Sequence, residues 1–158
     1  MADHKSTEKH PAFHISKYWV GFNRDNSDQP IVNVWLKNDG IATDATANLF
    51  FEVFSYPPDG NHEQNIRTSI DDFKTHKFAH QGLIFRFDPN SEKYFTIPGP
   101  IFSPSAKSDL IHGKYVLYFG GSIEFPSDNS KPLHFCAFVL GNNLDTVIDC
   151  PVSARGDF

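Results

Sequence analysis

Short apolar runs that alternate with polar residues dominate the chain, and they predict β-strands. Alternation at every second position places apolar side chains on one face of an extended chain. The clearest run extends from Ile31 to Lys37, where Val32, Val34 and Leu36 share one face. Further runs of this kind cover residues 13–22, 46–56, 83–87, 93–97, 114–125, 133–140 and 145–150. The pattern therefore predicts about eight short strands.

Turn residues separate these runs. The sequence Asn38-Asp39-Gly40 supplies residues that tolerate positive φ, and Pro57-Pro58-Asp59-Gly60 is a strong turn signal. Gly120-Gly121 interrupts the run at 114–125. Paired glycines inside a strand predict a bulge, or a bend by which the strand passes between sheets.

Helical patterns are short. Residues 66–78 fit a short helix with Ile70 and Phe73 on one side, and residues 105–112 fit one helical turn. The run at 46–56 is apolar on both faces, since Leu49, Phe51 and Val53 alternate with Phe50, Glu52 and Phe54. We therefore expect a loop or a partner to cover the face of that strand that is turned away from the core.

This series of short apolar runs separated by turn residues predicts an all-β fold. We expect an immunoglobulin-like β-sandwich of about seven to nine strands with at most one or two short helical turns. The 158 residues fit one domain, and the 16 phenylalanines can supply its core with few, large side chains. Residues 13–152 form that domain, the polar residues 1–12 form a disordered tail, and residues 153–158 form a frayed C-terminus.

Net charge and hydropathy limit the classes of partner and the cellular locations that the sequence allows. The net charge of −5 argues against a nucleic-acid-binding protein, which needs a basic face to neutralise phosphates. No stretch approaches the roughly 18 apolar residues of a membrane span, and the polar start carries no signal peptide. Location stays open: either the protein is cytoplasmic, or any membrane contact is made through a segment outside this sequence.

Two segments resemble a family of small bacterial domains of unknown function. The first runs from Val32 through Asn38-Asp39-Gly40 to Ala45, and the second runs from Gly113 to Phe125 and is followed by His134-Phe135-Cys136. In that family an immunoglobulin-like sandwich follows N-terminal membrane helices and faces away from the cytoplasm. The resemblance implies a periplasmic or other extracytoplasmic location. It implies no activity and carries over no catalytic residue.

The histidines are the first candidates for chemistry. His76 and His80 stand four positions apart, which on a helix places two imidazoles on one face as a metal site requires. No third ligand is adjacent, so we predict a solvated pair, no metal site and no cofactor. No catalytic motif is present, and Asp71-Asp72 reads as solvated, so we predict that the chain is not an enzyme.

The two cysteines lie on successive predicted strands. If a turn at Gly141-Asn142-Asn143 forms a hairpin centred on Asn143, Cys136 and Cys150 stand directly opposite each other. Opposed positions in a hairpin are close to disulfide reach. In an exported protein, we give a disulfide between them and a pair of free thiols equal weight. In the cytosol we expect both cysteines to be buried thiols.

Four aromatic residues offer a second kind of site. Trp19, Trp35, Phe50 and Phe54 form a stacking platform for sugars or peptides if they share an exposed face. The alternative, which we favour, is that they pack under the segment at 61–81, because a soluble monomer rarely leaves a large apolar patch bare.

Three functions fit these patterns. The first is a non-catalytic binding module that contacts an unknown protein or glycan partner through edge strands or end loops. It would be the exposed domain of a bacterial envelope protein and a monomer or weak dimer. The alternative is a carbohydrate-binding module that uses the aromatic face. A second alternative is an enzyme with a loop-assembled site of histidines and carboxylates around His76, His80 and His112. The C-terminal Arg155-Gly156-Asp157 is read as a chance match to an integrin-binding tripeptide.

Overall fold

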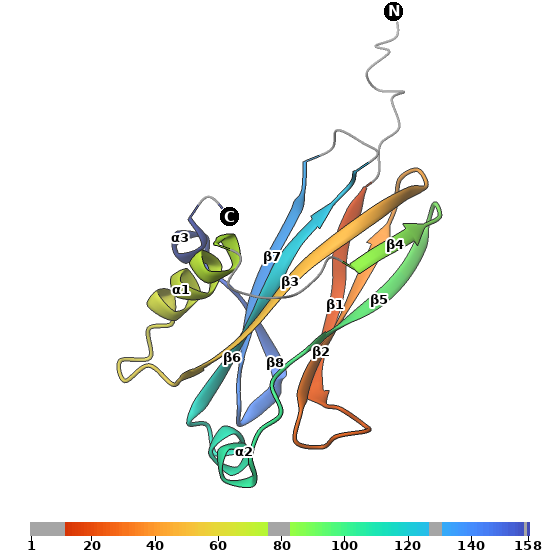
Figure 1. Cartoon of the computed structure of the whole chain (residues 1–158). Coiled ribbons are helices and arrows are strands. Elements are labelled where there is room, and N and C mark those ends of the chain that lie inside the picture. Colours follow the sequence, from red (N-terminus) through yellow and green to blue (C-terminus); the bar gives the residue numbers. More distant parts are fainter. Residues whose placement is uncertain (1–11, 76–82, 127–130, 157) are drawn as a thin grey trace, which may run out of the picture.

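The chain folds as two packed antiparallel sheets, shown in Figure 1. This computed structural model describes residues 12–75, 83–126, 131–156 and 158. One sheet has the strand order β1-β2-β5, and the other has the order β4-β3-β6-β7-β8. The strands are β1 (Phe13–Phe22), β2 (Pro30–Asn38), β3 (Thr43–Ser55), β4 (Leu83–Phe87), β5 (Ser91–Pro98), β6 (Tyr115–Glu124), β7 (Leu133–Leu140) and β8 (Asn143–Asp149).

The core between the sheets follows the alternation of the sequence. Val32, Val34 and Leu36 of β2 are fully buried, and they pack in the same cluster as Leu117 and Phe119 of β6. Burial along β2 alternates at every position, as expected for a strand with one face on the core. The prediction of about eight strands in a two-sheet fold is therefore confirmed.

The described residues also form three helices: α1 (Glu63–Lys74), α2 (Pro104–Ile111) and α3 (Val152–Arg155). The expectation of at most one or two short helical turns was wrong, because α1 alone has 12 residues. Ile66 and Ile70 are buried on one side of α1, and this packing stabilises a helix whose sequence propensity is ordinary. In the described part of the chain, no helix is long and apolar enough to cross a membrane.

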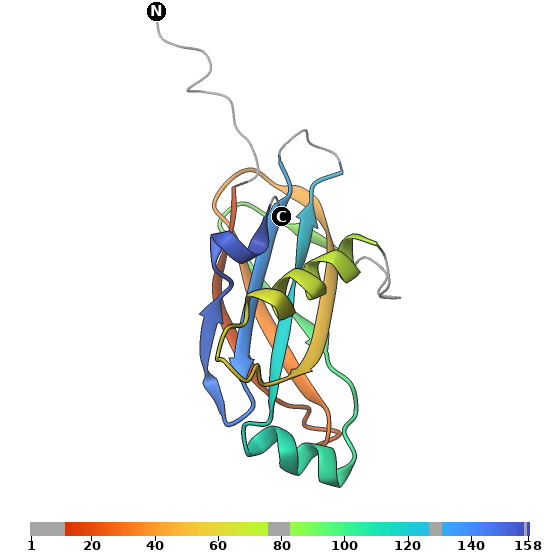
Figure 2. The same cartoon turned by 90° about the vertical axis from the view of Figure 1, so that its left-hand side faces the viewer.

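Helices α1 and α3 cover the outer face of the five-stranded sheet (Figures 1 and 2). Phe50 of β3 and Tyr118 of β6 are fully buried there, in one cluster with Ile66 and Ile70 of α1 and Ala154 of α3. The apolar outer face predicted for β3 is thus real, and α1 is its cover. Helix α2 lies at one end of the sandwich (Figure 1).

The C-terminal residues differ from the frayed end expected from the sequence. Residues Val152–Arg155 form α3, and Ala154 is buried. The ring of Phe158 lies 6.4 Å from the ring of Phe50 and 4.7 Å from the ring of His134. The end of the chain is therefore held by apolar contacts with the outer face of the five-stranded sheet.

The turn after β2 works through a side chain rather than through positive φ. Asn38 is buried, and its Oδ1 accepts a hydrogen bond from the Gly40 backbone N–H at 2.9 Å. Its Nδ2 donates to the carbonyl oxygens of Ile41 at 2.8 Å and Asp88 at 3.3 Å. Asn90 is the one non-glycine residue with positive φ in the described ranges. Asn38 therefore joins the turn after β2 to the turn between β4 and β5.

The paired glycines in β6 mark a close approach, not the predicted bulge or bend. The register of β6 is continuous through Gly120 and Gly121 against both β3 and β7. A Cβ atom on Gly120 would overlap the Phe135 carbonyl oxygen and the ring of Phe50, and one on Gly121 would overlap the carbonyl oxygen of Asn48. Glycine is needed here because the neighbouring strands and the Phe50 ring occupy the space of a side chain.

Candidate binding face

The solvent side of the three-stranded sheet carries a row of aromatic rings. Trp19 comes from β1, Trp35 from β2 and Tyr94 from β5. Their neighbours along the strands, such as Val34 and Phe95, are buried between the sheets, so alternation turns these three rings outward. Trp19 is 46% exposed and Tyr94 is 56% exposed, while Trp35 is partly exposed.

The strand register sets the rings side by side. Trp35 pairs with Lys17 of β1 and with Tyr94 of β5. The centroids of the Trp35 and Tyr94 rings are 5.2 Å apart, and the Nζ of Lys17 lies 4.5 Å from the centroid of the Trp35 ring. That ammonium group is within the range of a cation–π contact. Trp19 lies in the next row, opposite Asn33.

A glycine allows the Trp19 ring to lie flat on the sheet. A Cβ atom on Gly21 would overlap the far edge of the Trp19 indole, so the ring occupies the space where another residue would carry its side chain. Since nearly half of Trp19 is still exposed, the side of the ring turned away from the sheet meets solvent. Gly21 therefore orients Trp19 as a flat apolar surface.

Polar groups lie between the rings. Thr96 pairs with Asn33 across β2 and β5, and its Oγ1 donates a hydrogen bond to Asn33 Oδ1 at 2.7 Å. No bond joins the Asn33 amide nitrogen to another residue in the part of the chain that the structure describes. At the edge of the face, Ser16 Oγ donates to Glu92 Oε2 at 2.7 Å. The face thus offers hydrogen-bonding groups beside each aromatic surface.

Charges on this face are mixed. The basic groups are Lys17 and Lys37, and the carboxylates Glu92 and Asp39 lie on or beside the same face. Lys37 Nζ is 3.7 Å from Asp39 Oδ1, and His14 Nδ1 is 3.1 Å from Asp39 Oδ2. Lysines and carboxylates therefore balance one another, and the face has no strong excess of either sign.

The structure separates the four aromatic residues that the sequence grouped together. Phe50 and Phe54 belong to β3, in the other sheet, and Phe50 is fully buried with its ring 5.4 Å from the ring of Phe73 in α1. A single platform of four rings was therefore wrong for Phe50 and Phe54, because β2 and β3 lie in opposite layers. The favoured alternative, packing under the segment at 61–81, holds for Phe50. It was wrong for Trp19 and Trp35, because their strands belong to the three-stranded sheet and α1 covers the other one.

Tyr94 is the member of the face that sequence reasoning missed. It lies inside a strand that was predicted correctly, at residues 93–97. Its partner was not predictable, because β5 pairs with β2 across 52 intervening residues between Asn38 and Ser91. A cross-strand register between distant segments leaves no mark in the local pattern.

Of the three histidine candidates, His112 lies within the described residues. His76 and His80 fall outside them. His112 follows α2, and its Nδ1 is bonded to the Ser108 carbonyl oxygen at 2.6 Å. Among the described residues, no group of at least three His, Cys, Asp or Glu side chains is placed to hold a metal ion.

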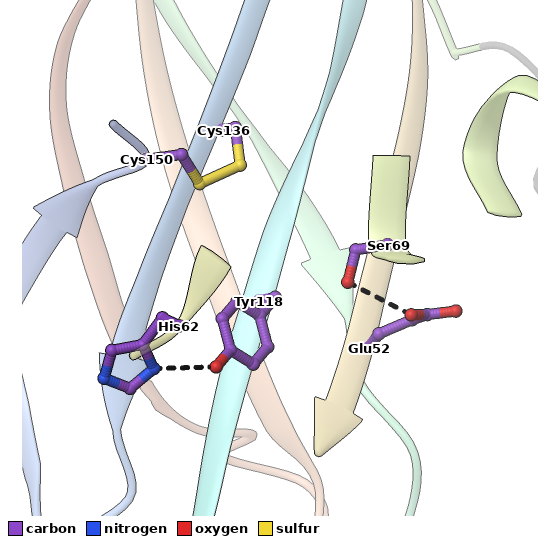
Figure 3. Close-up of a disulfide and its surroundings, with 6 residues drawn as sticks. All are labelled: Glu52, His62, Ser69, Tyr118, Cys136 and Cys150. Atoms are coloured by element: carbon purple, nitrogen blue, oxygen red, sulfur yellow. Dashed lines mark hydrogen bonds between the residues drawn. A yellow bond between two sulfur atoms is a disulfide. The ribbon is translucent and has the colours of Figure 1, made fainter. Parts of the chain in front are cut away.

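A polar cluster lies under the start of α1 and was also missed (Figure 3). His62 Nδ1 is 2.8 Å from Tyr118 Oη, and Asn65 Nδ2 donates to the same oxygen at 3.0 Å. Tyr118 Oη is therefore hydrogen-bonded to two side chains from the start of this helix. Burial raises the pKa of Tyr118 to about 12 and lowers the pKa of His62. Both groups are therefore neutral near pH 7, and the cluster fastens α1 to β6.

A second polar contact holds the other side of α1. Ser69 is buried, and its Oγ donates to Glu52 Oε2 of β3 at 3.1 Å (Figure 3). An open groove of about 670 Å³ runs beside these contacts, lined by residues that include Tyr56, Asn65 and Arg67. Its lining is mixed in character, and the contacts beneath it act to position the helix.

Cys136 and Cys150 form a disulfide bond, drawn in Figure 3. Their Cα atoms are 5.4 Å apart, and the Cys150 N–H donates to the Cys136 carbonyl oxygen at 3.0 Å. The turn itself is tighter than expected, since Leu140 already pairs with Asn143. A register shift between Phe138 and Leu140 then brings the two cysteines opposite each other.

No protein-family model, curated protein or solved structure matches this chain. The assignment of a function therefore depends on the geometry described above.

Proposed function

We propose that the chain is a non-catalytic binding module of immunoglobulin-like fold, and that it works as the exposed domain of a bacterial envelope protein. Its contact surface is the outer face of the β1-β2-β5 sheet, rather than the edge strands or end loops. The module acts as a monomer or weak dimer. Its partner is a component of the cell envelope.

Strand order supports the immunoglobulin-like assignment. If the first seven strands are lettered A, B, C, C′, E, F and G, the smaller sheet has the order A-B-E and the larger one contains C′-C-F-G. Immunoglobulin sandwiches divide their strands between two sheets in this way. The strand β8 is an addition beside G, and the disulfide stays within one sheet instead of joining strands B and F.

The disulfide supports a location outside the cytoplasm. Disulfides persist in oxidising compartments, whereas the cytosol keeps thiols reduced. The described residues contain no free cysteine, so both sulfurs are used in this bond. This agrees with the exposed position that the sequence resemblance implies.

The observation that carries the proposal is the difference between the two outer faces. The chain covers the outer face of the five-stranded sheet with α1 and α3 (Figure 2). Phe50 and Tyr118 are buried there. On the opposite outer face, Trp19 and Tyr94 keep about half of their surface exposed. Contiguous apolar patches on a protein surface mark interaction sites, and tryptophan and tyrosine are enriched among the residues that dominate binding energy.

Co-sedimentation with isolated bacterial cell envelopes tests this function. The wild-type module is expected to sediment with the envelopes, and a Trp19→Ala/Tyr94→Ala variant is expected to stay in the supernatant. Ile84→Ser serves as the matched control, because Ile84 is 78% exposed but lies on β4 in the other sheet. Circular dichroism and thermal unfolding verify that all variants fold.

Two results would overturn the proposal. One is a wild-type module that does not sediment with envelopes. The other is equal sedimentation of the wild type and the double variant, which would place the contact elsewhere on the molecule.

A further inference from the structure

We infer that the outer face of the β1-β2-β5 sheet binds a neutral, linear oligosaccharide. Sugar rings would stack on Trp19 and Tyr94, and Asn33 and Thr96 would bond to hydroxyl groups between them. This inference rests on the proposed function and names the chemistry of its ligand.

The shape of the aromatic surface suits a sugar ring. A pyranose has C–H groups on its two faces and hydroxyl groups around its rim, so it stacks on a flat π-surface and bonds at its edges. Trp19 offers such a surface because Gly21 lets the indole lie flat. Tyr94 offers a second one, steadied by its contact with Trp35.

The spacing of the rings calls for an oligosaccharide. Trp19 and Tyr94 lie on strands separated by β2, one row apart on the same face. Two strand spacings and two residues along a strand amount to roughly 12 Å. A single sugar ring is too small to reach both surfaces, so a chain of several units gains a second stacking contact that a monosaccharide lacks.

The polar groups between the rings match sugar hydroxyls. Thr96 Oγ1 donates to Asn33 Oδ1, which leaves the Asn33 amide hydrogens to donate to a ligand. The hydroxyl oxygen of Thr96 retains capacity to accept a hydrogen bond. This pair lies in the row of Trp19, directly beside the stacking surface.

The charge balance favours a neutral ligand over a charged one. Lys17 and Lys37 are matched by Glu92 and Asp39 on or beside the same face. A polyanionic glycan would meet the carboxylates, and a cationic one would meet the lysines. Lys17 is further engaged by the Trp35 ring.

The size of the surface favours a saccharide over a protein partner. With Trp19 and Tyr94 about half exposed and Trp35 partly exposed, the three rings offer roughly 300 Å² of aromatic surface. A stable protein–protein interface takes about 800 Å² from each partner. The aromatic face supplies less than half of that, which is enough to hold a few sugar units.

Nuclear magnetic resonance titration with defined neutral oligosaccharides tests the inference. The probes are hexamers and monomers of β-1,4-glucose, β-1,4-N-acetylglucosamine, β-1,4-xylose and α-1,4-glucose. At least one hexamer is expected to shift amide signals in β1, β2 and β5 saturably, and its monomer is expected to bind at least about tenfold more weakly.

Variants separate the contacts. Trp19→Ala and Tyr94→Ala are each expected to weaken binding of that hexamer at least about tenfold. Gly21→Ala keeps the indole but pushes it off the sheet, so it is expected to weaken binding to a similar extent. Ile84→Ser is expected to leave the affinity unchanged. The result for Gly21→Ala is interpreted only if this variant unfolds at the same temperature as the wild type. Tyr94→Ala tests the site independently, because it removes an exposed ring.

Each failure has its own meaning. Suppose that no hexamer shifts the amide signals of β1, β2 and β5, but that the module still binds envelopes and this binding requires Trp19 and Tyr94. The saccharide inference is then overturned, and the proposed binding function stands. If a hexamer binds equally well to the Trp19→Ala and Tyr94→Ala variants, the site is overturned. If monomers bind as tightly as hexamers, the two-ring site is overturned. If neither envelopes nor saccharides bind the wild type, both proposals fail.

Discussion

Removal of the disulfide should lower the free energy of unfolding by a predictable amount. The variant is Cys136→Ala/Cys150→Ala, in which alanine avoids placing an unpaired hydroxyl in a buried apolar site. Both cysteines are buried, in the cluster that contains Phe50 and Ala154. The mutation therefore removes a crosslink and two sulfur atoms while it introduces no new polar group.

Chain entropy sets the magnitude. The cysteines are 14 positions apart, so the bond closes a short loop in the unfolded chain. A crosslink over a loop of this length restricts the unfolded state by about 3 kcal/mol. For a chain of this size, that loss corresponds to a fall in Tm of roughly 6–12 °C.

Urea unfolding followed by tryptophan fluorescence and far-ultraviolet circular dichroism measures the change. The free energy of unfolding of the wild type without reductant is expected to be about 3 kcal/mol higher than that of the reduced wild type and that of the variant. Reductant is expected to leave the variant unchanged, which controls for effects of the reductant itself. Intact mass is expected to rise by two hydrogens on reduction of the wild type.

Two outcomes would refute this reasoning. A wild-type mass that does not change on reduction would mean that no bond exists. A variant that loses less than about 1 kcal/mol would mean that the unfolded chain is already restricted around the β7–β8 turn, so that the crosslink removes little further entropy.

Three more predictions address contacts that hold the fold. Asn38→Ala leaves the Gly40 N–H and the Ile41 carbonyl without their buried partner, and is expected to lower stability by about 2–4 kcal/mol in urea unfolding. Phe50→Ala is expected to lower stability by about 3–5 kcal/mol, and the partly exposed Phe54→Ala by clearly less, in the same assay. Burial lowers the pKa of His62 and of His134 below 6.5, so the unfolded chain takes up protons before the native one as pH falls. The urea concentration at the unfolding midpoint is therefore expected to decrease as the pH is lowered from 7.5 to 5. A variant with glutamine at both positions is expected to show a smaller decrease. The first argument would be contradicted if the Asn38→Ala variant were as stable as the wild type. The second would be contradicted by equal losses of stability in the Phe50→Ala and Phe54→Ala variants, and the third by a urea midpoint that does not depend on pH.

Local patterns predicted the elements well wherever one face of a strand meets the core. The alternation of Val32, Val34 and Leu36 predicts β2, and the matching burial follows from its place in the sandwich. The segment with Ile70 and Phe73 was recognised as helical over residues 66–78, whereas α1 spans Glu63–Lys74. Helix α1 depends on tertiary packing over Phe50, which no local propensity encodes.

The candidate face was predicted only in part. Trp19 and Trp35 were named from the sequence as members of a candidate stacking platform, and they do lie on one face, although packing under the segment at 61–81 was the favoured prediction for them. Phe50 and Phe54, which were grouped with them, lie on β3 in the other sheet. The assignment of strands to sheets, which decides whether two outward phases coincide, depends on pairings between segments far apart in the chain.

The sequence by itself determined which segments are strands, where the chain turns, and which side chains within each strand share a face, because these follow from a local period of two residues. Tertiary structure alone decided which strands are neighbours. That arrangement placed Tyr94 beside Trp35 and set Trp19 and Phe50 in different sheets. The hairpin that opposes Cys136 and Cys150 was predicted from the sequence, but its tight turn and register shift were not. Long-range pairing is chosen by the total burial that the whole chain achieves, and no short segment contains that information.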